Sequence, residues 1–152
     1  GVMCSGEKMR NNQLIYVLYG AGNTGKTTTL RLLGKKLEAV AISSCVIPEK
    51  GDFSTIFDIR GVRVAITSAG DNEHEIRTGL EKLNEHGPFD ILFCASRTRG
   101  QTTHYLMDIF KEQNLRWVDN MYVSDSNESH VQLCNEAVAN FLFSSLLIEL
   151  RT

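Results

Sequence analysis

The chain lacks several features that would define its class at once. It has only two prolines, no C-x-x-C pair among its four cysteines, and a formal net charge of −2. The near-neutral charge argues against a protein that works mainly by binding duplex DNA, because such proteins are usually basic. The scattered cysteines argue against a zinc ribbon or a disulfide framework and fit a reducing cytosol. No unbroken apolar run approaches the roughly 18 residues of a membrane span, so we expect a cytoplasmic protein without a membrane segment.

Length and composition indicate one folded domain. Apolar residues make up 42% of the 152 residues and charged residues 22%, which is ordinary for a globular protein. A chain of this length can bury a substantial core. We expect residues 1–13 to be a flexible N-terminal segment and residues 14–152 to form a single domain. Gly1 is not an initiator residue, so we expect the first residues to include a cloning remnant.

Short apolar runs alternate with helical periodicities along the chain. The apolar runs predict strands at residues 14–19, 41–47, 53–59, 62–67, 90–95 and 117–123. Apolar side chains at three- and four-residue spacing predict helices that begin near residue 26, follow residues 71 and 100, and span 129–150. Arg60-Gly61 predicts a tight hairpin turn. The alternation predicts a three-layer α/β fold, in which a mostly parallel sheet has helices on both faces and a β-hairpin edge strand.

The most informative stretch is GAGNTGKT, at residues 20–27. It matches G-x-x-x-x-G-K-[ST] between a predicted strand and a predicted helix, which is the context that a phosphate-binding loop requires. Glycines let the backbone curl closely around a phosphate, and the loop N–H groups and the helix N-terminus favour an anion. We expect Lys26 to reach the β- and γ-phosphates and Thr27 to hold Mg²⁺. The other residues of this stretch expected to bind the nucleotide are Gly20, Gly22, Asn23, Thr24, Gly25 and Thr28.

Over nearly its whole length the chain resembles a P-loop NTPase, with the Walker A motif as the specific part. It is too short for an AAA+ module with a helical lid. Within the superfamily it is more similar to small Ras-like GTPases and small P-loop kinases. In the GTPases a D-x-x-G segment contacts Mg²⁺ and the γ-phosphate. Here Gly70 fits that glycine, but Thr67 stands at the aspartate position. Asp71 is then the best carboxylate for Mg²⁺ or for the attacking water, the alternative being a helix N-terminal carboxylate.

The only sequence feature that bears on the identity of the nucleotide base is the absence of a guanine-recognition motif. GTPases recognise guanine with an N-K-x-D motif after a later strand, and residues 124–127 read Ser-Asp-Ser-Asn instead. The resemblance therefore favours ATP over GTP.

A second loop, residues 96–102, follows a strongly apolar predicted strand. The loops at the carboxyl ends of parallel strands surround the ligand, so this loop should face the P-loop. Arg97 and Arg99 could bind phosphate there or stabilise the charge that is transferred, and the alternative is two solvated arginines.

A third loop, residues 48–55, stands where a GTPase has a switch and a kinase has an acceptor-binding segment. Asp52, Ser54 and Thr55 could each reach Mg²⁺ or a substrate, and the sequence does not choose between them.

The sequence as a whole predicts an enzyme that binds Mg²⁺ with ATP or GTP and hydrolyses the nucleotide. Lys26, Asp71 and Arg97 are the expected catalytic residues, Thr27 and Asp71 the metal ligands, and Arg99 a further phosphate contact. Two alternatives stay open: a small-molecule or nucleoside kinase with an acceptor pocket, and a nucleotide-dependent switch that acts on a protein partner. The last helix is apolar on more than one stripe, so part of it could form a homodimer contact. Nothing indicates a nucleic-acid partner.

Overall fold

The computed structural model describes residues 13–22, 24–42, 47–98, 100–124 and 127–151. Within these residues five strands form one mixed sheet in the order β2-β3-β4-β1-β5. The strands are β1 (Leu14–Tyr19), β2 (Ser54–Ile59), β3 (Val62–Thr67), β4 (Ile91–Ser96) and β5 (Leu115–Asp119). β2 pairs antiparallel with β3 at one edge, and the other neighbours pair in parallel. The predicted α/β class, the mostly parallel sheet and the hairpin edge strand are confirmed.

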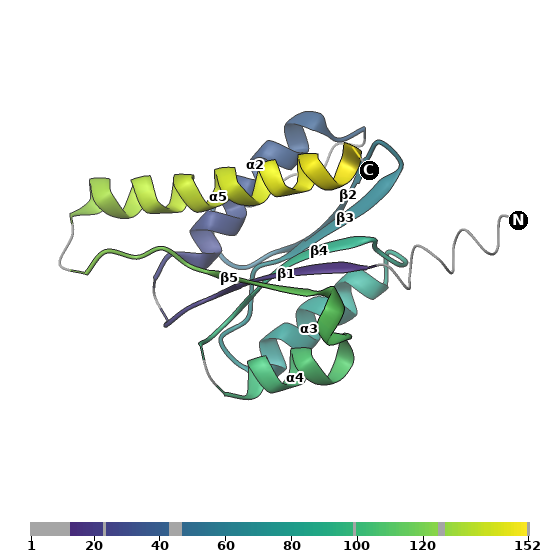
Figure 1. The fold of residues 1–152 in the computed structure, drawn as a ribbon, viewed down its shortest axis with the longest axis horizontal. Coiled ribbons are helices and arrows are strands. Elements are labelled where there is room, and N and C mark those ends of the chain that lie inside the picture. The colour runs from purple at the N-terminus through teal and green to yellow at the C-terminus, as the bar shows by residue number, and fades with distance from the viewer. Residues whose placement is uncertain (1–12, 23, 43–46, 99, 125–126, 152) are drawn as a thin grey trace, which may run out of the picture.

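Helices cover both faces of this sheet (Figure 1). One face carries α2 (Lys26–Val40) and α5 (Glu128–Arg151), and the other carries α3 (Glu73–Asn84) and α4 (Gln101–Ile109). A 3₁₀ turn, Glu112–Asn114, precedes β5. The side chains of β1 alternate between the two apolar clusters: Tyr16 and Leu18 pack on the first face, Ile15 and Val17 on the second. Burial on both faces explains why β1 and β4 are continuous apolar runs.

The helix α5 agrees with the predicted 129–150 to within one residue at each end. By length and composition alone it could cross a membrane, with a mean hydropathy of 1.3 over its most apolar 18-residue window. That differs from the expectation drawn from unbroken apolar runs, but it is weak evidence, because the core helix of a soluble protein passes the same test. Val138, Leu142 and Leu146 pack into the cluster shared with α2 and the sheet. The large apolar side chains that α5 leaves exposed are Leu133, Phe141 and Ile148. The expected homodimer contact stays a prediction.

Two predicted strands differ from the structure. Of the 41–47 run, residues 43–46 lie outside the described residues, and the described Ala41, Ile42 and Ile47 belong to no strand. The predicted 117–123 strand is shifted: β5 begins at Leu115 and ends at Asp119. Residues 121–123, although apolar, are exposed. Hydrophobicity alone misplaced the end of β5, because pairing with β1 stops where β1 itself ends, opposite Asp119.

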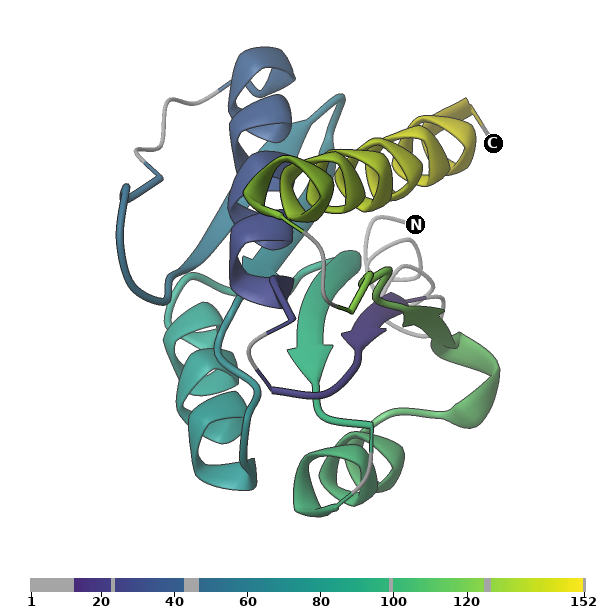
Figure 2. The same cartoon turned by 90° about the vertical axis from the view of Figure 1, so that its left-hand side faces the viewer.

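The strand order brings three loops to one edge of the sheet. β1 lies between β4 and β5, and all three run in the same direction. At their carboxyl ends the Gly20 N–H donates to the Ser96 carbonyl at 3.1 Å, and the Asn120 N–H to the Tyr19 carbonyl at 2.9 Å. The loops after β1, β4 and β5 therefore start side by side, and Figure 2 views the molecule from this side.

Candidate phosphate-binding site

The glycine-rich stretch forms the loop between β1 and α2. Gly25 has φ +88°, a left-handed conformation that favours glycine, and its carbonyl accepts the first helical hydrogen bond from Thr29 N–H at 2.9 Å. The Lys26 side chain folds back over the loop, where its Nζ donates to the carbonyls of Gly20 at 2.7 Å and Ala21 at 2.8 Å. These bonds use two of the three ammonium donors, so within the described residues one donor remains for a ligand.

The charges around Lys26 come from two other loops. Lys26 is only 6% exposed, and this burial lowers its pKa, while Asp71 acts to raise the pKa and Arg97 to lower it. Arg97 Nε lies 3.6 Å from Asp71 Oδ1. A Cβ on Gly22 would lie 2.7 Å from Arg97 Nη2, so the guanidinium rests directly against the glycine-rich loop. The three residues predicted to be catalytic thus lie together.

Asp71 does not cap the helix that follows it. Asn72 is the N-cap of α3, and its side chain accepts a hydrogen bond from the Glu75 N–H at 2.9 Å. The Asp71 carboxylate, in the loop after β3, instead pairs with Arg97 in the loop after β4. The position of Asp71 depends on Gly70, because a side chain at that residue would overlap the Ala95 carbonyl of β4.

Asn135, which no sequence motif singled out, joins α5 to the helix and loop at Gly25 and Thr29. Its side chain is buried, and its Oδ1 accepts from the Thr29 hydroxyl at 3.2 Å. A Cβ on Gly25 would lie 2.5 Å from the same oxygen. A polar residue on the otherwise apolar inward face of α5 was the available signal. A cavity of about 370 Å³ opens here, lined by Thr24, Gly25, Lys26, Thr27, Thr28, Asp71, Val131 and Asn135.

Asn120, just after β5, was not singled out either. Its Nδ2 donates to the Thr24 carbonyl at 2.6 Å and to the Thr24 hydroxyl at 3.2 Å. Its Oδ1 is buried and has no hydrogen-bond partner among the described residues. Asn120 therefore ties the residue that follows β5 to Thr24 of the glycine-rich loop.

The loop before β2 places Asp52 beside Thr27. The Thr27 hydroxyl donates to Asp52 Oδ1 at 3.2 Å, and the Ser68 hydroxyl donates to the same oxygen at 3.1 Å. Ser54 turns instead to the Thr67 hydroxyl at 2.7 Å. The sequence left Asp52, Ser54 and Thr55 open as candidates, and Asp52 forms this hydrogen bond with Thr27.

The remaining predicted residues are only partly placed. Asn23 and Arg99 lie outside the described residues. Among the residues that the structure does describe, no group of three or more His, Cys, Asp or Glu side chains could hold a metal ion.

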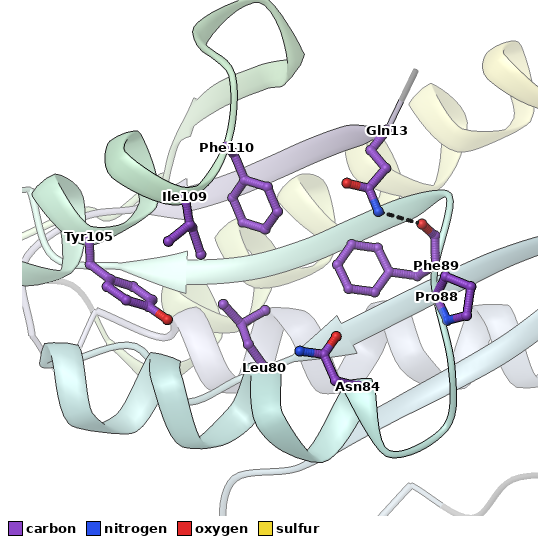
Figure 3. Close-up of a pocket in the computed structure, with 8 residues that line it drawn as sticks. All are labelled: Gln13, Leu80, Asn84, Pro88, Phe89, Tyr105, Ile109 and Phe110. Atoms are coloured by element: carbon purple, nitrogen blue, oxygen red, sulfur yellow. Dashed lines mark hydrogen bonds between the residues drawn. The ribbon is translucent and has the colours of Figure 1, made fainter. Parts of the chain in front are cut away.

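A groove of a different kind lies between α3 and α4 on one face of the sheet (Figure 3). It is lined by Gln13, Leu80, Asn84, Pro88, Phe89, Tyr105, Ile109 and Phe110. Gln13 Nε2 donates to the Phe89 carbonyl at 2.8 Å, and these two residues lie next to the amino ends of β1 and β4. The groove is mainly apolar, and its end at Gln13 and Phe89 lies at the other end of the strands from the glycine-rich loop.

No protein family, curated protein or solved structure matches this chain. The interpretation of the site therefore depends on its residues, their spacing and their contacts.

Proposed function

We propose that the chain is a P-loop nucleotide-binding protein that hydrolyses a nucleoside triphosphate with the help of Mg²⁺. The observation that carries this proposal is the complete Walker A motif, folded as a loop between a buried strand and a helix, with the buried Lys26 ammonium over its carbonyls. A buried charge is costly unless an opposite charge pairs with it, and the two carbonyls that accept from Lys26 are neutral. The phosphates of a nucleotide would supply the opposite charge.

Hydrolysis of the γ-phosphate requires little covalent chemistry from the protein. The oxygen of a water forms a bond to the γ-phosphorus, the bond to the β–γ bridging oxygen breaks, and a diphosphate, inorganic phosphate and a proton are released. The protein positions the phosphates and offsets their charge. Lys26 and the loop N–H groups would act on the β- and γ-oxygens. Arg97, which rests against Gly22, would stabilise charge on the transferred group, and Asp71 would orient Arg97 or the water. Mg²⁺ would neutralise further phosphate charge when bound.

ATP is the more favoured nucleotide. The Thr67 side chain, at the position of the GTPase aspartate, is fully buried and bonds Ser54, so it is not available to a metal or a γ-phosphate. The chain also has no N-K-x-D motif for guanine at residues 124–127. Both departures argue against a Ras-like GTPase cycle.

Phosphate release tests the proposal. Wild-type protein with Mg·ATP should release phosphate faster than with Mg·GTP, and Lys26→Ala should reduce the rate roughly 100-fold or more. Lys82→Ala is the matched control, because it removes an exposed lysine from the last turn of α3 and should leave the rate unchanged.

Two results would contradict the hydrolase. Release that Lys26→Ala does not alter would mean that the P-loop is not the site. Tight nucleotide binding without any release would favour the alternatives, a kinase that lacks its acceptor or a switch that lacks its protein partner.

A further inference from the structure

We infer that Asp52, and not Asp71, is the protein carboxylate that joins Thr27 in holding Mg²⁺ at this site. The inference rests on the proposed function, because Mg²⁺ would arrive with the nucleotide. It selects Asp52 from the three candidates within residues 48–55 that the sequence left open.

The spacing of the two oxygens fits one octahedral ion. Mg²⁺ holds its ligands at about 2.1 Å, so two adjacent ligands lie about 3 Å apart. Thr27 Oγ1 and Asp52 Oδ1 lie 3.2 Å apart. A hydroxyl and a carboxylate are oxygen ligands of the kind that Mg²⁺ prefers, and the ion usually completes its shell with phosphate oxygens and water rather than with a cage of protein groups.

Neighbouring groups hold the Asp52 carboxylate in this place. The Ser68 hydroxyl, at the end of β3, donates to Asp52 Oδ1, while its oxygen accepts from the Phe53 N–H at 2.8 Å. The Ser68 N–H donates to the Phe53 carbonyl at 3.0 Å. Since Ser68 is buried, these bonds fasten the loop to the sheet directly beside Asp52.

The same loop is also fastened to α2. Arg31 donates from Nε to the Pro48 carbonyl at 2.9 Å and from Nη2 to the Gly51 carbonyl at 2.6 Å. Thr27 lies one turn before Arg31 on the same helix. One helix therefore positions both the hydroxyl and the loop that carries the carboxylate, which is the preorganisation that a metal site requires.

Asp71 is less suited to this role because it already faces cations. Its Oδ1 lies 3.6 Å from Arg97 Nε, and its charge acts on Lys26. A divalent ion on Asp71 would have to compete with the guanidinium. The contacts of Asp71 fit a residue that positions Arg97 against the P-loop.

Nucleotide affinity with and without metal separates the two carboxylates. We would measure the affinity of full-length protein for fluorescent ADP and ATP in Mg²⁺ and in EDTA, for wild type, Asp52→Asn and Asp71→Asn. Asp52→Asn should lower the enhancement by Mg²⁺ roughly 10- to 100-fold, a loss typical for a damaged metal site, with no loss of affinity in EDTA. Asp71→Asn should keep the enhancement. Titration of Mn²⁺ into the ADP complexes, followed by electron paramagnetic resonance, should give the same order of metal affinities. Thermal unfolding would verify that each variant is folded.

Each other outcome overturns the inference in a recognisable way. Loss of the enhancement in Asp71→Asn, alone or together with Asp52→Asn, would make Asp71 a ligand while the proposed nucleotide binding survives. An unchanged enhancement in both variants would exclude both carboxylates. If wild type binds no nucleotide in either buffer, the proposed function fails, and this inference fails with it.

Discussion

The two edges of the sheet are built for different tasks. At the carboxyl edge, loops from β1, β3 and β4 bring together a buried lysine, an Arg97–Asp71 pair and glycines pressed against neighbouring groups. At the amino edge, a hydrogen bond joins Gln13 to Phe89, and both residues line one end of a mainly apolar groove between α3 and α4. Under the proposed function, the polar groups at the first edge would bind the ligand, whereas the side chains at the second edge contribute mainly burial.

This contrast makes a general prediction about mutations. Changes at the amino edge should alter the free energy of unfolding and leave nucleotide affinity unchanged. Changes at the carboxyl edge should alter nucleotide affinity even where their effect on stability is moderate. Substitutions at each edge separate the effects on stability from the effects on nucleotide affinity.

Phe89→Ala should have the largest effect on stability. Phe89 is 5% exposed and packs in the cluster between the sheet, α3 and α4, so truncation should cost about 3–5 kcal/mol. Urea unfolding gives this value. Nucleotide affinity, measured where the variant is still folded, should match wild type, because Phe89 lies at the far end of the strands. A parallel loss of affinity would show that the two edges are coupled.

Gly70→Ala should damage both stability and binding. The new Cβ would overlap the Ala95 carbonyl, which is backbone and cannot rotate away, so we expect a cost of about 3 kcal/mol. The resulting shift would also displace Asp71 and loosen Arg97. Gly61→Ala is the control: it has φ +81° in the hairpin turn, with nothing within 4 Å of the added Cβ. It should cost about 1 kcal/mol and spare nucleotide affinity. Equal affinities in the two variants would contradict this role for Gly70.

We expect water to be excluded from the Cys94 thiol in the middle of the sheet, and the stability of the protein at alkaline pH tests this. Burial raises the pKa of Cys94 on β4 to about 12, from 9.0 for an exposed thiol. The stability linked to this thiol is complete below pH 9 and is lost as the pH rises toward 12, because only the unfolded chain ionises easily in that window. Wild type should therefore lose about 1.4 kcal/mol per pH unit more than Cys94→Ala. Chemical denaturation across this range measures the difference, and parallel curves would mean that water reaches Cys94.

The sequence predicted the fold well where the signal is local. The β1 strand, the glycine-rich loop and the start of α2 follow one another directly, and the continuous apolar runs of β1 and β4 report burial on both faces. The hairpin at Arg60-Gly61 is equally local. These elements need no knowledge of distant residues, so composition and spacing were sufficient.

The rest of the site depends on contacts between distant segments. The choice of Asp52 over Ser54 follows from Ser68, 16 residues further along the chain, and from Arg31 on α2. The role of Asn135 follows from a hydrogen bond that spans 106 positions. Residues 117–123 contain a favourable apolar pattern, yet the pairing with β1 ends the strand at Asp119. A single sequence carries no record of such long-range geometry.

Asn135→Ala should give the smallest effect, and it tests whether α5 belongs to the carboxyl edge. The substitution leaves the fully buried Thr29 hydroxyl without its acceptor, which should cost about 1 kcal/mol. Asn140→Ala is the matched control, because Asn140 is exposed on the same helix and gains the same helix propensity. Since Asn135 also lies against Gly25, its loss should weaken nucleotide binding several-fold, whereas Asn140→Ala should not change it. If both variants bind nucleotide equally well, α5 contributes only to the hydrophobic core. The nucleotide would then contact only the loops that follow the strands.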